Sequence, residues 1–148
     1  MDTHQHIGPE GELERRYDAL DAAQQAQALG MRAIVPGHAR PARPLAALVN
    51  RLLPGFTAVG AVVCDLWVGG LNPLAVQVAL EQGARVVWMP TWTSHENLRR
   101  FDLLPGAATP PGRPLPIRVE TLHRIGDGIR LVDNAGALVP AVATRFST

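Results

Sequence analysis

The chain has 148 residues, 47% of them hydrophobic, which predicts one domain with a sizeable core. Its 14 basic and 13 acidic residues give a formal net charge of only +1, so no nucleic-acid partner is expected. Every basic residue is arginine, which excludes a Schiff-base lysine and a carbamylated-lysine metal bridge within this chain. With one cysteine, Cys64, and no export signal or membrane-spanning run, we expect no intrachain disulfide, no membrane partner and a cytoplasmic location.

Two histidines stand at the start of the chain, in a stretch that is expected to form a strand. Alternate side chains of a strand point to the same face, so His4 and His6 share a face with Asp2. Gly8 and Pro9 then form a turn, which leaves both rings at the carboxyl end of the strand, where parallel α/β proteins carry their active sites. Because imidazole is the commonest metal ligand, the pair predicts a metal site; the alternative is a frayed terminus without a role.

The next elements alternate between helix and strand. Apolar residues with helical spacing predict a helix over 17–29, closed by Gly30, and a short apolar run predicts a strand over 31–35. His38 lies in the turn that follows this strand. A second helix is predicted over 44–53, where Pro54 and Gly55 end it.

The same alternation continues to residue 89. A Val-rich run predicts a buried strand over 56–67, with Asp65 near its end, where a strand-end cap is favoured over a residue of an active-site mouth. Asn72 and Pro73 are a strong helix start, and the helix is expected to reach Gln82. A fourth strand follows over 84–89. This order predicts an α/β fold with a parallel sheet and crossover helices.

The pattern changes after residue 90. Ser94 is expected to cap a short helix that reaches about Phe101, and the Pro/Gly-rich stretch 105–116 is expected to be a loop. Alternating segments around Asp127–Gly128, with a further turn at 134–136, predict a small antiparallel β excursion within 117–139. Residues 140–146 have the pattern of a helix start. We therefore divide one domain, 1–148, into βα units (1–104), a loop (105–116), and the excursion with the helix start (117–148).

The opening motif, Asp2-Thr3-His4-Gln5-His6 before Gly8-Pro9, resembles the first-strand metal motif of the amidohydrolase superfamily. With the blocks at 30–35, 38, 68–73, 83–91 and 133–140, the chain more closely resembles an uncharacterised family of amidohydrolase-like metal-dependent hydrolases. The resemblance implies a (β/α)8 TIM-type barrel with one or two divalent metals at its carboxyl mouth. It also implies hydrolysis of an amide, ester or related bond in a small-molecule substrate, with zinc as the expected cofactor and manganese or iron as alternatives.

The chain departs from these relatives at several positions. Pro36 stands near His38 where a Lys is expected, and Thr93 and Leu98 stand where an acidic residue and a His are expected, with His95 nearby in a different register. The later barrel strands, which supply a further Asp ligand, are absent. Because such a barrel takes about 250 residues, four parallel strands amount to about half of it. We therefore expect a partial domain.

Four histidines are the candidate metal ligands, and no residue is assigned as the catalytic base. His4 and His6 are the first two. His38 is a third ligand or holds substrate, against the alternative of a solvated loop residue, and His95 is the weakest candidate, against that of a surface residue in a first helical turn. Asp2 is a candidate for orienting one of the rings.

Three hypotheses follow for the function. The first is a metal-dependent hydrolase. The second is a non-catalytic remnant that acts as a scaffold, since several expected ligands are missing. The third is a half-barrel that self-associates into a homo-oligomer, because an unclosed half would expose two sheet edges and an apolar face.

Overall fold

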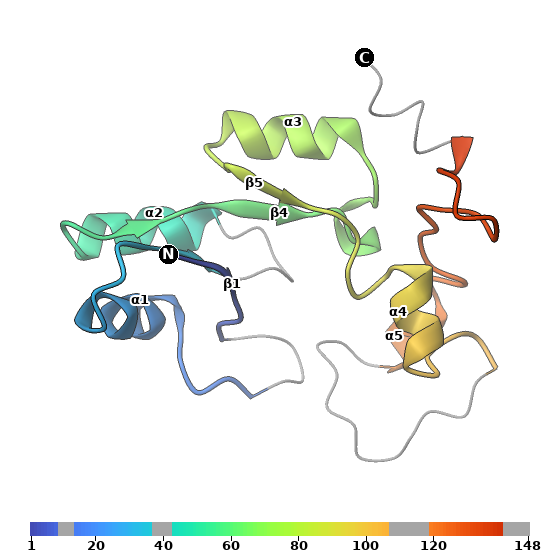
Figure 1. Ribbon diagram of the computed structural model, residues 1–148, viewed down its shortest axis with the longest axis horizontal. Helices are drawn as coiled ribbons and strands as arrows, with labels where there is room; N and C mark the ends of the chain where they lie inside the picture. The colour runs from blue at the N-terminus through green and yellow to red at the C-terminus, as the bar shows by residue number, and fades with distance from the viewer. Residues whose placement is uncertain (9–13, 37–42, 107–118, 141–148) are drawn as a thin grey trace.

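A computed structural model describes residues 1–8, 14–36, 43–106 and 119–140 (Figure 1). The elements in chain order are β1 (Asp2–Gln5), α1 (Ala19–Ala28), β2 (Ala33–Pro36), α2 (Arg43–Leu52), β3 (Thr57–Ala58), β4 (Ala61–Val63), the 3-10 helix η1 (Leu66–Val68), α3 (Pro73–Glu81), β5 (Val86–Trp88), α4 (His95–Arg100) and α5 (Val119–His123). His38, most of the predicted loop at 105–116 and all but the first residue of the predicted helix at 140–146 lie outside the described residues.

The strands are all parallel and follow the order of the chain. One sheet has the order β1-β2-β3, and a second pairs β4 with β5. Only two residues separate β3 from β4. Val59 donates from its backbone N to the carbonyl of Ile34 at 2.9 Å, whereas the carbonyl of Gly60 accepts from Arg85 N at 2.9 Å. The stretch 57–63 therefore pairs first with β2 and then with β5. The predicted α/β class with a parallel sheet is confirmed, and the described strands form no closed barrel.

Three of the helices begin at residues whose side chains cap them. Asp18 accepts from the backbone N of Leu20 and Asp21 at the start of α1, and Asn72 accepts from Leu74 N just before Pro73 at the start of α3. Ser94 caps α4, as its position after a strand predicts. The predicted helix starts at Asn72 and Ser94 are thus confirmed.

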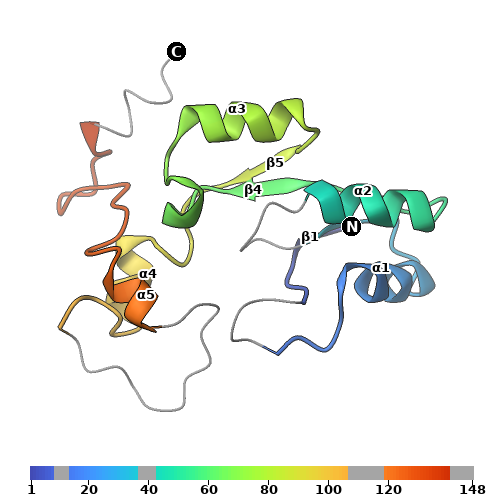
Figure 2. The ribbon, with the colours of Figure 1, turned by 180° about the vertical axis from the view of Figure 1, so that it is seen from behind.

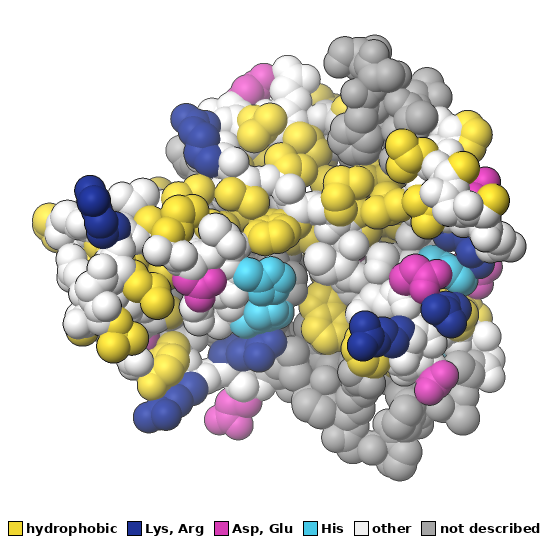
Figure 3. All heavy atoms as spheres, viewed as in Figure 1, with side chains coloured by type: hydrophobic (Ala, Val, Ile, Leu, Met, Phe, Trp, Pro, Cys, Tyr) yellow, Lys and Arg dark blue, Asp and Glu magenta, His cyan; other side chains and the backbone are white. Residues whose placement is uncertain are grey.

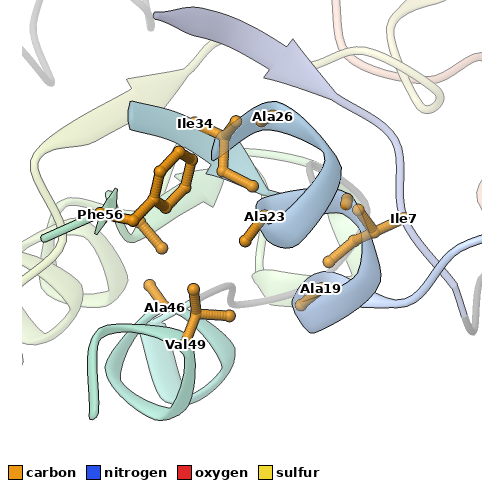
Figure 4. Packing of buried hydrophobic residues seen from close by; sticks show 10 residues of the cluster. Ile7, Ala19, Ala23, Ala26, Ile34, Ala46, Val49 and Phe56 are labelled. Carbon is orange, nitrogen blue, oxygen red and sulfur yellow. The ribbon is translucent and has the colours of Figure 1, made fainter. Parts of the chain in front are cut away.

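The largest core cluster lies between the first two helices and the sheet. Figure 4 shows Ala23 of α1 and Val49 of α2 facing Ile34 of β2, with Phe56 beside them. The small alanine side chains of α1 let this helix approach β2 closely. Asn50 of α2 adds a polar tie, because its side chain both donates to and accepts from the backbone of Ala58. This packing fixes the position of β2, and β1 is held by its pairing with β2.

The predicted antiparallel excursion is confirmed only in its last part, at the turn over 134–136, and the predicted hairpin at Asp127–Gly128 is wrong. Residues 119–123 form α5, and Ile129 makes a parallel bridge to Ser94; only Val132 and Leu138 form an antiparallel bridge. The reason lies at Gly128, which has a φ of +73° and whose added Cβ would lie 2.6 Å from the carbonyl oxygen of Thr93. A glycine here allows the chain to pack its backbone against the segment after β5, rather than to form a hairpin.

The carboxyl ends of the strands face the second half of the chain. In Figures 1 and 2, α1 and α2 lie at one end of the molecule, α4 and α5 lie at the other, and β4 and β5 run between them. In the described ranges, no helix is long and apolar enough to span a bilayer.

Candidate functional site

A cleft of about 880 Å³ opens at the carboxyl ends of β1 and β5. Its strand-end wall consists of His4, His6, Thr91, Trp92 and Ser94, and its other wall is α4 with the residue after it: Glu96, Asn97, Arg99, Arg100 and Phe101. Figure 3 shows histidine side chains together at the surface near the centre of this face, above an arginine. The cleft therefore lies where a parallel sheet is expected to carry its active site.

His4 and His6 lie side by side, as the strand pattern predicts. Their Nε2 atoms are 3.1 Å apart and their ring centroids 5.0 Å apart. Asp2, which the sequence suggested as a residue that orients a ring, instead accepts from the backbone N of His4 at 2.9 Å through its Oδ1. Its carboxylate thus stabilises the main chain of β1 at the point where the first histidine emerges.

Arg15 determines which nitrogen of His6 carries the proton. Its Nη2 lies 3.1 Å from His6 Nδ1. A guanidinium group can only donate, so Nδ1 must accept, and the proton of neutral His6 is then on Nε2. That proton faces Nε2 of His4, which must accept it. The three side chains therefore form a directed chain of hydrogen bonds from Arg15 through His6 to His4.

His4 also contacts a strand that is not its neighbour. The ring of Trp88 on β5 meets the His4 ring edge-on, with 5.2 Å between centroids. Both β2 and the stretch 57–63 lie between β1 and β5, and in a flat sheet three strand spacings amount to about 14 Å. The contact therefore requires the strands to curve, so that the side chains of one face converge.

A second polar cluster holds the strand ends together. Asp65 follows β4, is fully buried, and accepts four hydrogen bonds. Thr91 donates from its N and Oγ1 at 3.1 and 2.9 Å, and Thr93 donates from its N and Oγ1 at 2.9 and 2.6 Å. Asp65 therefore ties the end of β4 to the loop after β5, which is the structural role that the sequence favoured for it.

His95 does not join His4 and His6. It is 7% exposed, and its Nδ1 lies 2.8 Å from the carbonyl oxygen of Asp127, so Nδ1 carries the proton. It lines a separate cavity of about 670 Å³ against residues 129–134. In the parts of the chain that the structure describes, no three His, Cys, Asp or Glu side chains gather at one point. The candidate site therefore has two of the four predicted ligands, and His38 is untested.

Comparison with known proteins places the chain in a family. Residues 1–145 match the model of a family described as a family of unknown function, DUF6282. The chain belongs to the DUF6282 family. Neither the curated proteins nor the solved structures include a match. The description of the DUF6282 family names no activity.

Two side chains of the described residues have altered acidity, Glu96 in the cleft and the buried Cys64. Hydrogen bonds from Arg99 hold the pKa of Glu96 below its usual range, with smaller help from the charges of Arg99, His95 and Arg130, while desolvation opposes the shift. Glu96 is therefore a weak base near neutral pH. Burial, aided by the charge of Asp65, raises the pKa of the Cys64 thiol, so this buried cysteine is a poor nucleophile.

Several cleft residues of this DUF6282 chain were not anticipated from the sequence. The presence of Arg100 and Phe101 in the cleft could have been predicted from the helix start at Ser94. A helix that starts directly after a strand places its residues beside the carboxyl end of that strand. Arg15 had no comparable signal. It lies nine residues beyond His6, and its contact depends on how the intervening chain turns.

Proposed function

We propose that this chain is a metal-dependent hydrolase of the amidohydrolase type, in which His4 and His6 bind a divalent cation, with zinc favoured over manganese or iron. Its substrate is a small molecule with an amide, ester or related bond. The observation that carries the proposal is the distance of 3.1 Å between the Nε2 atoms of the two histidines at the edge of the cleft.

That distance suits two ligands of one ion. Zinc binds imidazole nitrogens at about 2.0 to 2.1 Å, so two ligands of a tetrahedral ion lie about 3.3 Å apart. The pair needs only a small movement to reach this separation. It also stands beside a cleft large enough for a small molecule, which leaves room for substrate next to the ion.

The arrangement of the strands supports a barrel as the underlying architecture. The parallel strands lie side by side in the order in which they occur along the chain. A helix separates each of β1, β2, β3 and β5 from the next of these strands. The His4–Trp88 contact also requires a curved sheet. Four successive βα units with this curvature are what one half of a (β/α)8 barrel would contribute.

The histidine pair fits a cation in spacing but not in its present hydrogen bonding. A histidine that binds a metal through Nε2 usually donates from Nδ1 to a carbonyl or carboxylate. Nδ1 of His6 instead faces Arg15, which can only donate. Binding through Nε2 therefore requires the Arg15 contact to be given up. His38, which lies outside the described residues, stays the proposed third ligand.

A cation bound at this pair would supply the Lewis acidity that activates water for attack on a carbonyl carbon. The residues of the chain hold and enclose the substrate. Trp92 and Phe101 offer flat apolar surfaces, and the Asp65 network holds the 91–94 segment that carries Trp92. Glu96 is not assigned as the general base, because its pKa is low and both of its bonds to Arg99 would have to break.

Metal binding is the first test. Protein stripped with EDTA is titrated with Zn²⁺, Mn²⁺ and Fe²⁺ in a calorimeter, and bound metal is measured by elemental analysis after dialysis. We expect about one zinc per chain, lost in His4→Ala and in His6→Ala. A panel of nitrophenyl esters and anilides, assayed with and without zinc, then tests for metal-dependent turnover.

Two control variants separate the site from general effects on the fold. Thr3→Ala lies on β1 between Asp2 and His4, is exposed, and should leave zinc binding unchanged. His95→Ala removes a histidine that stands apart from the pair and should also leave the stoichiometry unchanged. Failure to take up stoichiometric metal, or equal binding by His4→Ala and the parent chain, contradicts the proposal.

An exposed apolar surface favours a second candidate function, a non-catalytic half-barrel that self-associates. Helix α3 has no buried residue, and Leu74, Val78 and Leu80 on it are exposed, as are Val87 and Met89 on and after β5. Figure 3 shows hydrophobic side chains in a band over β4 and β5. Light scattering at micromolar concentration tests this candidate. A monomeric mass overturns it, and a dimer that Val78→Glu dissociates supports it.

A further inference from the structure

The cleft holds a positive charge that no acidic side chain of the described residues neutralises. Its carboxylate, Glu96, is already paired, since Arg99 Nε and Nη2 both donate to Oε2 at 3.1 and 2.8 Å. The next residue, Arg100, forms no ion pair among the described residues, and its Cζ lies 5.9 Å from the centroid of the Phe101 ring. After the Glu96–Arg99 pair is set aside, Arg100 gives the cleft a net positive charge.

Two aromatic rings stand beside this charge on a rigid support. Trp92 and Phe101 both line the cleft, and both pack against the fully buried Leu98 and Leu103. The carbonyl of Trp92 also accepts from Asn97 Nδ2 at 3.1 Å, which fixes the loop that carries the indole. Rings held in this way offer flat apolar walls at little cost in conformational entropy.

From these features we infer the class of substrate: a small anion with a flat apolar body. Its carboxylate or phosphate binds Arg100, its body lies against Trp92 and Phe101, and its scissile bond is directed toward His4 and His6. Arginine suits this role because its planar guanidinium group matches the oxygens of a carboxylate or phosphate. The inference rests on the proposed function, since it names the substrate of the same site.

The binding of probe molecules to EDTA-treated protein is measured by calorimetry, so that neither bound metal nor turnover contributes to the heat. Benzoate and phenyl phosphate are the anionic probes, and benzamide is a neutral probe of the same shape as benzoate. We expect both anions to bind at least about fivefold more tightly than benzamide, the size of one modestly screened charge contact. The better of the two anions identifies the group that Arg100 prefers.

Arg100→Gln isolates the charge. It should weaken benzoate and phenyl phosphate about fivefold and leave benzamide unchanged, and Arg100→Lys should recover part of the loss. Arg124→Gln, at an exposed arginine that does not line the cleft, is the matched control. Arg100 also lies in the last turn of α4, where a cation favours the helix, so thermal unfolding of each variant checks that the fold is intact.

The outcomes separate this inference from the proposed function. Equal binding of benzoate and benzamide, no binding of either anion, or no effect of Arg100→Gln overturns the inference, even if zinc binds and neutral amides are hydrolysed. Anion binding through Arg100 without metal uptake or turnover keeps the anion site and overturns the hydrolase.

Discussion

Two polar clusters stand at the carboxyl ends of strands, the His4–His6 pair at β1 and Asp65 at β4, and they differ in how much water reaches them. Asp65, with Thr91 and Thr93, is sealed, and every oxygen of its carboxylate accepts from a neighbour. The His4–His6 pair lies in contact with the cleft. Position at a strand's carboxyl end therefore does not by itself mark a functional residue. A buried, fully bonded cluster stabilises the edge, whereas an accessible one is available for a ligand.

Removal of the buried Asp65 carboxylate should lower the free energy of unfolding more than any other change considered. Asp65→Ala leaves the backbone N–H groups of Thr91 and Thr93 without their acceptor, and each buried donor left unsatisfied costs about 1 to 3 kcal/mol. We expect the free energy of unfolding, measured in urea, to fall by about 3 to 5 kcal/mol. Asp127→Ala, at an exposed side chain, should change it by less than about 0.5 kcal/mol. Similar losses in the two variants would contradict the assigned role of Asp65.

Substitution of Gly128 tests the close backbone contact with Thr93, one of the two threonines that bind Asp65. Both Gly128 and Gly126 have positive φ, +73° and +64°, but only at Gly128 would a Cβ meet other atoms, the closest at 2.6 Å. Gly126→Ala should therefore cost about 1 to 2 kcal/mol from backbone strain alone. Gly128→Ala should cost at least about 1 kcal/mol more, because the neighbouring backbone has to move. Equal unfolding free energies for the two variants would mean that the close approach to Thr93 is absent.

The parts of the fold that the sequence predicted have local causes. Asn72 before Pro73 and Ser94 before a polar turn are capping signals that need no tertiary partner, and the helices start there. The shared face of His4 and His6 follows from the two-residue period of a strand. These features were predictable because the interacting groups are a few residues apart.

The parts that were missed depend on contacts between distant segments. The alternation around Asp127 is compatible with a hairpin, and nothing local reveals that Gly128 packs its backbone against Thr93 instead. His95 illustrates the same limit, because its position after a strand end suggested a metal ligand. The carbonyl of Asp127, 32 residues away in the chain, turns its ring into a different cavity.

Arg15 controls how available the His4–His6 pair is to a cation. If its guanidinium holds His6 in the tautomer that donates to His4, it competes with any cation for the same pair. Arg15→Gln removes a nearby positive charge and replaces a charged donor by a shorter neutral one, so zinc affinity should rise by up to about tenfold, the value of one charged hydrogen bond. Arg16→Gln alters an adjacent arginine that stacks on Tyr17 and should leave the zinc affinity unchanged. Weaker zinc binding in Arg15→Gln would instead make Arg15 a supporting residue of the site.

The smallest effect is expected where the polar contact is most exposed. Arg99 lowers the pKa of Glu96, and because a depressed carboxyl pKa favours the folded state only while the group is ionised, its contribution is lost as the pH falls through the folded-state pKa. Both side chains are largely solvated, so water and salt screen the pair. Arg99→Gln should raise the pKa of Glu96, followed by carbon-13 NMR, while the unfolding temperature at neutral pH stays nearly constant. If the pKa of Glu96 does not move, the charges of His95 and Arg130 cause the shift. A large fall in the unfolding temperature would show that the Glu96–Arg99 pair stabilises the fold as the buried Asp65 cluster does.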